Sequence, residues 1–355
     1  MRFGFVGLGF AAQWLHLPAV RSLAGCQAVG GVDLIGSRRQ EWESAGGGPT
    51  FESLDELFSQ ARPDVLVVGT PPDTHAAACM AAIDAGLHVV CEKPFVTTVA
   101  EADEVLAAAR RSGRQVAVNH EFRYMPIFAS ARAAIGRHDV GRLVFVQCTQ
   151  FMDLAPWDEA VPWRAAMPDR ALFEGGIHLV DLLHHLVGRS PRTVFAARSS
   201  GLDANRDADA VHLVTLDYGG GVLGQITIDR LCRSGTRYVD LRVDCEHASI
   251  RSSFGGRALV QVGLKRAQRP GIRFEFGPEG LAWVERGLRR RVIGRNGRRA
   301  TQKATAAVYA EALDAFRTGR EPATSGAVAR ATLAIVEAAY RSSRTGERVA
   351  LNHGR

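Results

Sequence analysis

The chain begins with a short apolar run and a glycine-rich turn whose residue types suit a phosphate site. Gly7, Gly9 and Ala12 follow the run 3–6 in the pattern G-x-G-x-x-A. The first glycine permits a tight turn, the second lets a pyrophosphate approach the backbone, and the small third residue lets the next helix pack closely. Because the N–H groups at a helix N-terminus attract phosphates, the pattern predicts that a dinucleotide binds here.

An acidic residue stands where a dinucleotide site needs one. Asp33 ends the strand-like run 28–33, 24 residues after Gly9, and a carboxylate at this place can accept hydrogen bonds from the adenosine ribose. The same carboxylate repels a 2′-phosphate, which favours NAD. Arg38 and Arg39 follow closely, and an arginine in this loop can hold the 2′-phosphate of NADP. We therefore expect NAD, with NADP as the open alternative.

The N-terminus has a rival interpretation as a lipoprotein signal, because the tetrapeptide L-A-G-C ending at Cys26 resembles a cleavage box. Polar or rigid residues interrupt the apolar stretch at Gln13, His16, Pro18 and Arg21, whereas a signal needs an unbroken one. Cleavage before Cys26 would also remove the glycine turn. We therefore expect a cytoplasmic protein that keeps its N-terminus.

Length and composition are those of an ordinary two-domain protein. The chain has 355 residues, of which 46% are hydrophobic and 23% charged, enough for two cores. No apolar run reaches the roughly 18 residues of a membrane helix, so we expect no membrane partner. The six cysteines form no C-x-x-C pair, which fits reduced thiols better than a zinc ribbon or a disulfide framework.

A strongly basic segment lies near the end of the chain. Its eight basic residues stand within 18 positions without an acid among them: Arg286, Arg289, Arg290, Arg291, Arg295, Arg298, Arg299 and Lys303. Such a cluster can bind nucleic acid or an anionic substrate. The alternative is a solvated loop that leads into the last helices. Because the segment has no interleaved aromatic residues and no known binding motif, we expect the loop, and no nucleic-acid partner.

The first third of the chain alternates strand-like and helical segments. Strands are predicted at 3–6, 28–33, 64–69, 88–91 and 115–119, and helices at 11–23, 53–60, 74–85 and 99–111. Gly86 and Gly113 are suited to end the last two helices. Continuous apolar runs such as 65–68 are typical of a parallel sheet covered on both faces. The alternation predicts a doubly wound, dinucleotide-binding Rossmann domain over residues 1–121.

From about residue 122 the pattern changes. A helix at 127–135 and a strand at 142–151 precede a loop and another helix, and helices at 305–318 and 327–343 close the chain. Strand-like runs at 211–218, 222–229, 238–243 and 249–253 are separated by turns such as 219–221. Successive strands of this kind predict a mostly antiparallel, open sheet. We expect a second α/β domain over 122–355 for substrate binding and oligomerisation.

The chain resembles the Gfo/Idh/MocA family of pyridine-nucleotide oxidoreductases. Motifs matching the family run in family order over nearly the whole chain, and together they are far more specific than any one alone. They are the glycine turn with His16-Leu17-Pro18, Gly69-Thr70-Pro71-Pro72-Asp73-Thr74-His75, Glu92-Lys93-Pro94, Glu121-Phe122-Arg123 with Pro126, Trp163-Arg164, Glu174-Gly175-Gly176-Ile177-His178-Leu179-Val180-Asp181-Leu182, and Gly319-Arg320-Glu321-Pro322 through Ser325-Gly326.

The resemblance implies which residues bind the cofactor and the substrate. The implied cofactor residues are Gly7, Gly9, Phe10, Ala11, Ala12, Asp33, Arg38, Thr70, Pro71, His75, Glu92 and Lys93, and the implied substrate residues are Arg123, Trp163, Arg164, Glu174 and His178. It also implies a cis peptide bond between Lys93 and Pro94, an isomer that only about one X–Pro bond in twenty adopts.

The resemblance implies catalytic roles as well. When a hydride leaves a carbinol carbon, the hydroxyl proton must leave too. His178, at the start of an apolar helix and after two glycines that permit close approach of substrate, is the expected base. Lys93 follows the strand 88–91, where its ammonium could stabilise an alkoxide or relay a proton. Glu174 is expected to orient His178 or to accept a substrate hydroxyl.

Glu174 is also a departure from the family pattern, which usually has aspartate four residues before the histidine. The longer side chain shifts the carboxylate by roughly a carbon–carbon bond length, so the substrate pose is expected to differ. A metal site is a further alternative, because His178, Asp181 and His185 share one helix face. Helical zinc ligands usually stand at i, i+4, and no cysteine completes the set. We expect no metal, with His184 and His185 packed or exposed.

The resemblance therefore implies an NAD(P)-dependent oxidoreductase that acts on the hydroxyl or keto carbon of a sugar, an inositol or a sugar derivative. Two alternatives of the same fold stay open: a glycosidase or lyase that oxidises its substrate transiently, and a non-catalytic sensor of dinucleotides. A sensor has no need of both Lys93 and His178. The resemblance also implies that the open face of the second sheet pairs with another subunit, so we expect a homodimer or homotetramer.

Overall fold

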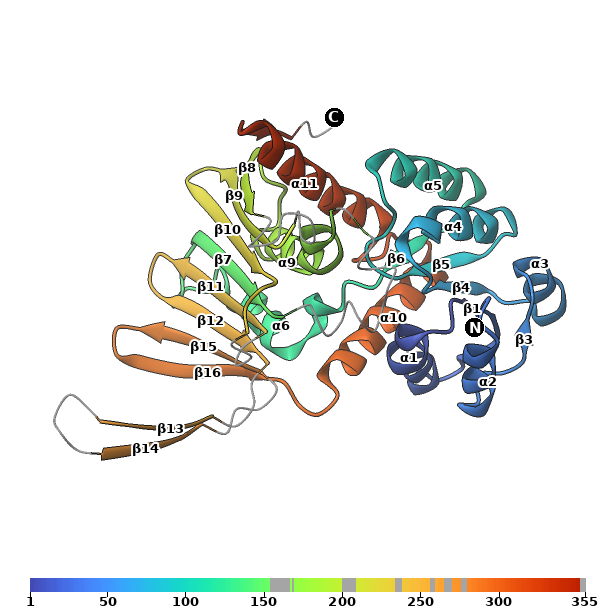
Figure 1. The fold of residues 1–355 in the computed structure, drawn as a ribbon, viewed down its shortest axis with the longest axis horizontal. Coiled ribbons are helices and arrows are strands. Elements are labelled where there is room, and N and C mark those ends of the chain that lie inside the picture. The colour runs from blue at the N-terminus through green and yellow to red at the C-terminus, as the bar shows by residue number, and fades with distance from the viewer. Residues whose placement is uncertain are drawn as a thin grey trace. The chain divides into compact units, whose positions relative to one another are not determined.

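The computed structural model describes residues 1–153, 167, 169–199, 209–233, 238–255, 259–264, 270–275 and 280–351 (Figure 1). The chain divides into two compact units. The first contains Met1–Tyr124 and Thr301–Glu337, and the second contains Met125–Ala300 and Ala338–Arg355. Among the described helices, none combines the length and the apolar character that crossing a membrane requires.

The first unit contains a six-stranded sheet in the order β3-β2-β1-β4-β5-β6. Its strands are β1 (Arg2–Val6), β2 (Gln27–Val32), β3 (Thr50–Phe51), β4 (Val65–Val68), β5 (His88–Cys91) and β6 (Val116–Val118). Every neighbouring pair is parallel, so the predicted doubly wound sheet is confirmed. The chain builds outward from β1 on one side and from β4 on the other, and the crevice between such halves is where these sheets bind ligands.

Helical segments connect these strands, and one more follows the last strand (Figure 1). They are η1 (Ala12–His16), α1 (Leu17–Ser22), α2 (Gly36–Ser44), α3 (Leu54–Glu56), η2 (Leu57–Ala61), η3 (Pro72–Thr74), α4 (His75–Asp84), α5 (Val99–Ser112) and η4 (Glu121–Tyr124). Thr98 and Glu101 form a capping box at the start of α5. Gly86 and Gly113 follow α4 and α5 with φ of +78° and +66°, as their predicted role in ending these helices requires.

A helix from the end of the chain completes the core of the first unit. This helix, α10 (Ala300–Thr318), contributes Tyr309, Ala312, Leu313 and Phe316 to a buried cluster with Phe3 and Phe5 of β1. The sequence-based boundary at 121/122 assigned this helix to the other domain. Helix α10 packs here because it covers the apolar surface of a sheet whose first strand contains Phe3 and Phe5. The sequence around α10 does not show which sheet the helix will cover.

The second unit contains a nine-stranded sheet in the order β16-β15-β12-β11-β7-β10-β9-β8-β17. Its strands are β7 (Leu143–Phe151), β8 (Thr193–Ser199), β9 (Val211–Gly219), β10 (Val222–Asp229), β11 (Val239–Cys245), β12 (Ser249–Phe254), β15 (Gly280–Arg286), β16 (Arg289–Arg295) and β17 (Val349–Ala350). Strands β13 (Leu259–Leu264) and β14 (Pro270–Glu275) form a separate hairpin. Only β7 and β10 pair in parallel within the nine-stranded sheet, so the mostly antiparallel prediction is confirmed.

Among the described residues of this unit, the helical segments are α6 (Pro126–Ala134), the π-helix η5 (Ala171–Gly176), α9 (Ile177–Val187) and the end of α11 (Gly326–Thr345). Helix α6 packs on β12, β15 and β16, and α9 packs on β7 and β10. Val146, Cys148 and Gln150 of β7 alternate as buried residues, whereas the residues between them are partly exposed and Phe151 is exposed. One face of the sheet is therefore packed and the other is open.

The basic segment is not the loop that the sequence predicted. Arg286 ends β15, and 289–295 form β16, the edge strand of the sheet. Arg290 stacks on Trp283 of the neighbouring strand, 3.7 Å from its ring centroid. The prediction was wrong because arginines on an exposed edge strand hide the two-residue period that identifies a strand. Charged residues on such an edge discourage pairing with another chain.

Candidate functional site

The glycine turn after β1 has the geometry of a phosphate cradle. Gly7 has a φ of +80° and donates a 2.9 Å hydrogen bond to the carbonyl of Val32. A Cβ on Gly7 would lie 2.6 Å from the backbone of Gly69 and Thr70, so only glycine fits. A Cβ on Gly9 would meet only the Arg38 guanidinium, 3.9 Å away. The turn therefore has open space beside Gly9, as the predicted approach of a pyrophosphate requires.

Asp33 lies at the end of β2, beside this turn. Its Oδ2 accepts a 2.7 Å hydrogen bond from the Leu8 N–H and its Oδ1 accepts one of 2.8 Å from Ile35. Nη1 of Arg38 is 3.8 Å from Oδ2, so both residues expected at the ribose are close together. The bond to Leu8 ties the acidic residue to the glycine turn, a role that was not predicted.

Two aromatic residues beside the turn form an exposed stack. Phe10 and Trp14 are 68% and 55% exposed, and their ring centroids are 5.5 Å apart. Phe10 was expected at the cofactor, whereas Trp14 was not. The i, i+4 spacing of two aromatic residues on one helix is the signal that could have identified the pair.

Thr70, Pro71 and His75 follow β4 and are the residues of this segment that were expected to contact the cofactor. The His75 ring is buried between carbonyls, with Nε2 2.8 Å from the oxygen of Thr70 and Nδ1 2.8 Å from that of Pro94. Burial lowers the pKa of His75, although these carbonyls oppose the shift. His75 thus joins the segment after β4 to the segment after β5, and its contact with cofactor stays a prediction.

Glu92, at the end of β5, is the centre of a buried polar network. Its Oε1 lies 2.9 Å from Nε2 of His16 and accepts a 2.7 Å hydrogen bond from Nδ2 of Asn119. The hydroxyl of Tyr309 on α10 is 2.8 Å from Nδ1 of His16. Burial by itself raises the pKa of Glu92, but His16, Lys93 and Asn119 together lower it to about 2. The carboxylate is therefore ionised at neutral pH.

Lys93 directly follows this carboxylate at the carboxyl edge of the parallel sheet. The Lys93–Pro94 peptide bond is cis, as expected. The backbone N–H of Lys93 donates a 3.2 Å hydrogen bond to Oε2 of Glu92. The glycine turn, Asp33 and Lys93, which are all expected to contact the cofactor, thus lie in the same unit.

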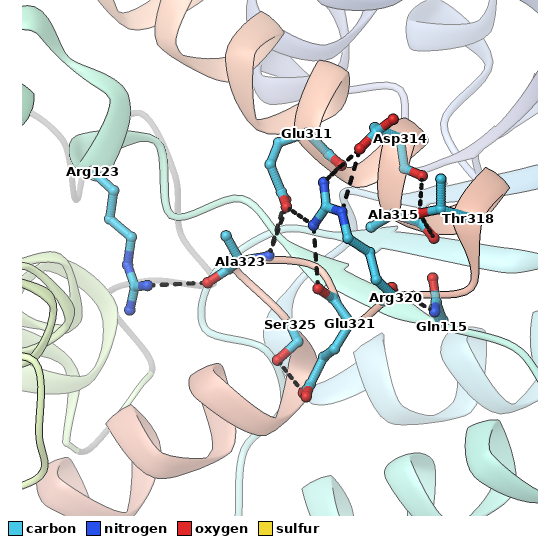
Figure 2. A network of polar contacts seen from close by, with 10 residues as sticks. All are labelled: Gln115, Arg123, Glu311, Asp314, Ala315, Thr318, Arg320, Glu321, Ala323 and Ser325. Carbon is cyan, nitrogen blue, oxygen red and sulfur yellow. Dashed lines mark hydrogen bonds and ion pairs between the residues drawn. The ribbon is translucent and has the colours of Figure 1, made fainter.

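Arg123, expected to bind substrate, is partly engaged within the first unit (Figure 2). Its Nη1 donates a 3.2 Å hydrogen bond to the carbonyl of Ala323. The same segment is held by Glu311, which accepts from the N–H of Ala323 at 3.0 Å, and by Arg320, which bonds Glu311 and Asp314. These contacts give the motif 319–326 a structural role, because they fix the segment that connects α10 to α11.

The second unit contains Glu174 on η5 and His178 in the first turn of α9. The His178 side chain is mostly buried, with 8% of the residue exposed. A Cβ on Gly175 would lie 1.8 Å from Nη2 of Arg230, and one on Gly176 would lie 2.1 Å from Cδ1 of Ile228. The two glycines therefore let this segment approach β10 and the residue after it, whereas their predicted role was to permit the approach of substrate.

Some expected features fall elsewhere. Trp163 and Arg164 lie outside the described residues. Within the described part of the chain, no group of three or more His, Cys, Asp or Glu side chains could hold a metal ion, which disfavours the alternative of a site at His178, Asp181 and His185. A cavity of about 470 Å³ in the second unit is lined by His138, Asp139, His247 and Arg286 and contains no expected site residue.

Comparisons with known proteins agree with this geometry. Residues 1–120 match the model of the oxidoreductase family with an NAD-binding Rossmann fold, and residues 128–251 match the Gfo/Idh/MocA C-terminal domain. A curated D-apiose dehydrogenase of Paraburkholderia graminis is 28% identical over 98% of this chain and 88% of its own length.

Solved structures share the fold over the whole chain. An oxidoreductase from Agrobacterium radiobacter, in complex with NAD+, L-tartaric acid and magnesium, superposes with a TM-score of 0.83 at 18% identity, covering 99% of this chain and 98% of that one. The WlbA dehydrogenase from Bordetella pertussis, in complex with NADH and UDP-GlcNAcA, superposes with a TM-score of 0.78 at 24% identity and covers 99% of both chains.

Fold and glycine turn together define an NAD-dependent oxidoreductase with a Rossmann domain and a second domain built on an open, mostly antiparallel sheet. The chain belongs to the Gfo/Idh/MocA family.

Proposed function

We propose that this enzyme transfers a hydride between NAD and a hydroxyl or keto carbon of a sugar, an inositol or a sugar derivative. The observation that carries the proposal is the ionised, buried Glu92 next to Lys93, in the same unit as the glycine turn and Asp33. The charged form of a lysine side chain is an ammonium group. That form can stabilise the negative charge that develops on a substrate oxygen.

In the oxidative direction the carbinol carbon loses a hydride and its hydroxyl loses a proton. NAD, when bound, supplies the hydride acceptor. His178 accepts the proton at an imidazole nitrogen, and the Lys93 ammonium stabilises the oxygen while the carbon–oxygen double bond forms. Glu174 accepts a hydrogen bond from a further hydroxyl of the substrate or orients His178. Reduction runs the same steps in reverse, with His178 donating the proton.

The substrate class rests on relatives. Besides the D-apiose dehydrogenase, an inositol 2-dehydrogenase of Salmonella paratyphi B is 23% identical over 61% of this chain. Polyhydroxylated compounds also suit a site that has a carboxylate and an imidazole four residues apart on consecutive turns of helix. Trp163, Arg164 and Arg123 are proposed as further contacts to the hydroxyl groups.

A substrate panel tests the proposal. Purified enzyme is incubated with NAD or NADP and D-apiose, myo-inositol and a set of aldoses and uronic acids, and both cofactor reduction and the carbon product are measured. Net NADH formation with an oxidised product supports the proposal. A changed product without net NADH supports the alternative glycosidase or lyase that oxidises transiently. Cofactor binding without any product, across the panel and its keto counterparts with NADH, favours the sensor.

We also propose that the open face of the second sheet joins two copies of this chain into a dimer or tetramer. Phe195, Leu213 and Leu223 lie on neighbouring strands of this face and are 40%, 49% and 47% exposed. Apolar side chains grouped on an open sheet mark an interaction surface. A second copy is the occupant that closed two-fold symmetry favours.

A further inference from the structure

Three backbone N–H groups at the start of η5 are bonded by side chains from distant parts of the second unit. The Ala171 N–H donates a 2.6 Å hydrogen bond to Oδ2 of Asp209. The N–H groups of Leu172 and Phe173 donate to the Tyr340 hydroxyl at 3.1 and 3.2 Å. The first N–H groups of a helix have no partner inside it. Here, residues that precede β9 and lie on α11 supply the partners instead of a local cap.

Asp209 and Tyr340 are themselves joined. The Tyr340 hydroxyl donates a 2.8 Å hydrogen bond to Oδ2 of Asp209, and Oδ1 of Asp209 contacts Nε2 of His212. Asp209, His212 and Tyr340 are 3%, 0% and 4% exposed. Both carboxylate oxygens and the hydroxyl are therefore engaged inside the protein, and hydrogen bonds among buried polar groups restrain the segments that they join.

Arg230 holds the same segment from a third direction. It follows β10, is 5% exposed, and its Nη2 donates a 3.0 Å hydrogen bond to the carbonyl of Ala171. Its guanidinium fills the position that a Cβ on Gly175 would occupy. Burial lowers the pKa of Arg230, and the charges of Glu174 and Asp209 are among those that oppose this. The guanidinium thus lies close enough to Glu174 for their charges to interact.

We propose that Asp209, Tyr340 and Arg230 are positioning residues, which hold η5 so that Glu174 and His178 keep the orientation that hydride transfer requires. The inference rests on the roles proposed above for Glu174 and His178. Both residues follow the bonded N–H groups within one to two turns of the same helical segment. A displacement of about 1 Å at a reacting group can cost on the order of 10²-fold in rate, so loss of one anchoring hydroxyl should reduce turnover.

Tyr340→Phe removes only the hydroxyl and is the main test. Tyr218→Phe is its matched control, because Tyr218 is a buried tyrosine of the same unit whose hydroxyl has no hydrogen-bond partner among the described residues. Amide hydrogen exchange of the peptide spanning 171–178 is measured by mass spectrometry, without substrate. We expect exchange about 10-fold faster or more in Tyr340→Phe and unchanged exchange in Tyr218→Phe.

Two further measurements separate positioning from a merely structural role. The pH titration of the His178 ring is followed by NMR of histidine-labelled protein and assigned with His178→Ala. Turnover is measured with the panel sugar that has the highest kcat/KM. We expect Tyr340→Phe to shift the His178 titration and to lower kcat about 10- to 100-fold, with Kd for NAD unchanged. Asp209→Asn provides a second variant with the same expected direction if Tyr340→Phe does not fold.

Unchanged exchange at 171–178 in the variants would overturn the inference. So would faster exchange with a wild-type His178 titration and wild-type kcat, because η5 would then be held for stability alone. Wild-type turnover by His178→Ala would instead overturn the proposed function, and with it the positioning role. The two failures are therefore distinguishable.

Discussion

Oε1 of Glu92 lies 2.9 Å from Nε2 of His16, which joins the end of β5 to the helix that follows the glycine turn. Tyr309 on α10 contacts the opposite nitrogen of the same imidazole at 2.8 Å. Three segments that are far apart in the chain thus meet at the residue directly before Lys93. The network holds a carboxylate in its ionised form at the edge of the sheet where the cofactor is expected.

Glu92→Gln tests the stability that this carboxylate provides. The pKa of Glu92 is lowered from 4.5 to about 2, so the ionised group stabilises the folded protein above pH 4.5, and this stabilisation is lost as pH falls toward 2. We expect the variant to be about 3 kcal/mol less stable than wild type at pH 7. The difference should shrink between pH 4.5 and 2 in urea unfolding curves.

Glu246→Gln is the matched control for that experiment. Glu246 also has a pKa lowered to about 2, chiefly by the side chain of Arg142, but this pair is at the surface and is screened by salt. The control should show a smaller change in unfolding free energy, which added salt reduces. Equal effects of the two substitutions at high salt would contradict the buried network.

His178→Ala and Lys93→Ala test the catalytic assignment. Each substitution should lower kcat by roughly 10² or more, since loss of general acid–base catalysis costs 10²- to 10⁴-fold, and NAD affinity measured by fluorescence should stay near wild type. If the two residues act as one proton-transfer unit, the double variant is little slower than the slower single variant. Wild-type turnover by both single variants would require another base.

Asp33→Ser tests the cofactor preference. Removing the carboxylate should weaken NAD binding, because the ribose loses a hydrogen-bond acceptor, and should improve NADP binding by leaving Arg38 free to meet the 2′-phosphate. Titration of both cofactors by fluorescence measures the change. Because Asp33 also accepts the Leu8 N–H, Asp33→Asn is the control that can keep this contact. Unchanged affinities for both cofactors would show that Asp33 is not at the ribose.

Leu213→Lys tests the open face as a subunit interface. A charge in the middle of an apolar interface is costly to bury, so the variant should dissociate at protein concentrations at which the wild type is oligomeric, as measured by analytical ultracentrifugation. Leu288→Lys is the control, because Leu288 is fully exposed in the turn between β15 and β16. A monomeric wild type, or identical sedimentation of the Leu213 variant and wild type, would reject this interface.

The elements that the sequence predicted well are those with strong local signals. The parallel strands β1, β4 and β5 are short apolar runs, and Gly113 ends α5 in the left-handed conformation that glycine favours. Helix α2 and strands β3, β8, β13, β14, β15, β16 and β17 were missed. In β16 the exposed arginines obscure the strand pattern, and an isolated edge strand depends on its partner for its structure.

The residues of the candidate site also differ in whether a local sequence signal predicted them. Gly7, Gly9 and Asp33 were predicted as cofactor residues from spacing, because a turn between a strand and a helix is a local structure. His16 and Tyr340 had no assigned role, although both now lie in buried networks beside expected site residues. The hydrogen-bond partner of a buried polar side chain is often distant in the sequence, so a local sequence pattern does not predict it.

The sequence by itself determined the class of fold, the glycine turn after the first strand and the acidic residue beside it, since periodicity, glycine positions and short spacings act over a few residues. Only the tertiary structure decided that α10 completes the first core, that His16 meets Tyr309 across 293 positions and that Tyr340 meets Asp209 across 131. These contacts form because apolar surfaces must be covered and buried polar groups must be paired, and both requirements are met only once distant segments have packed together.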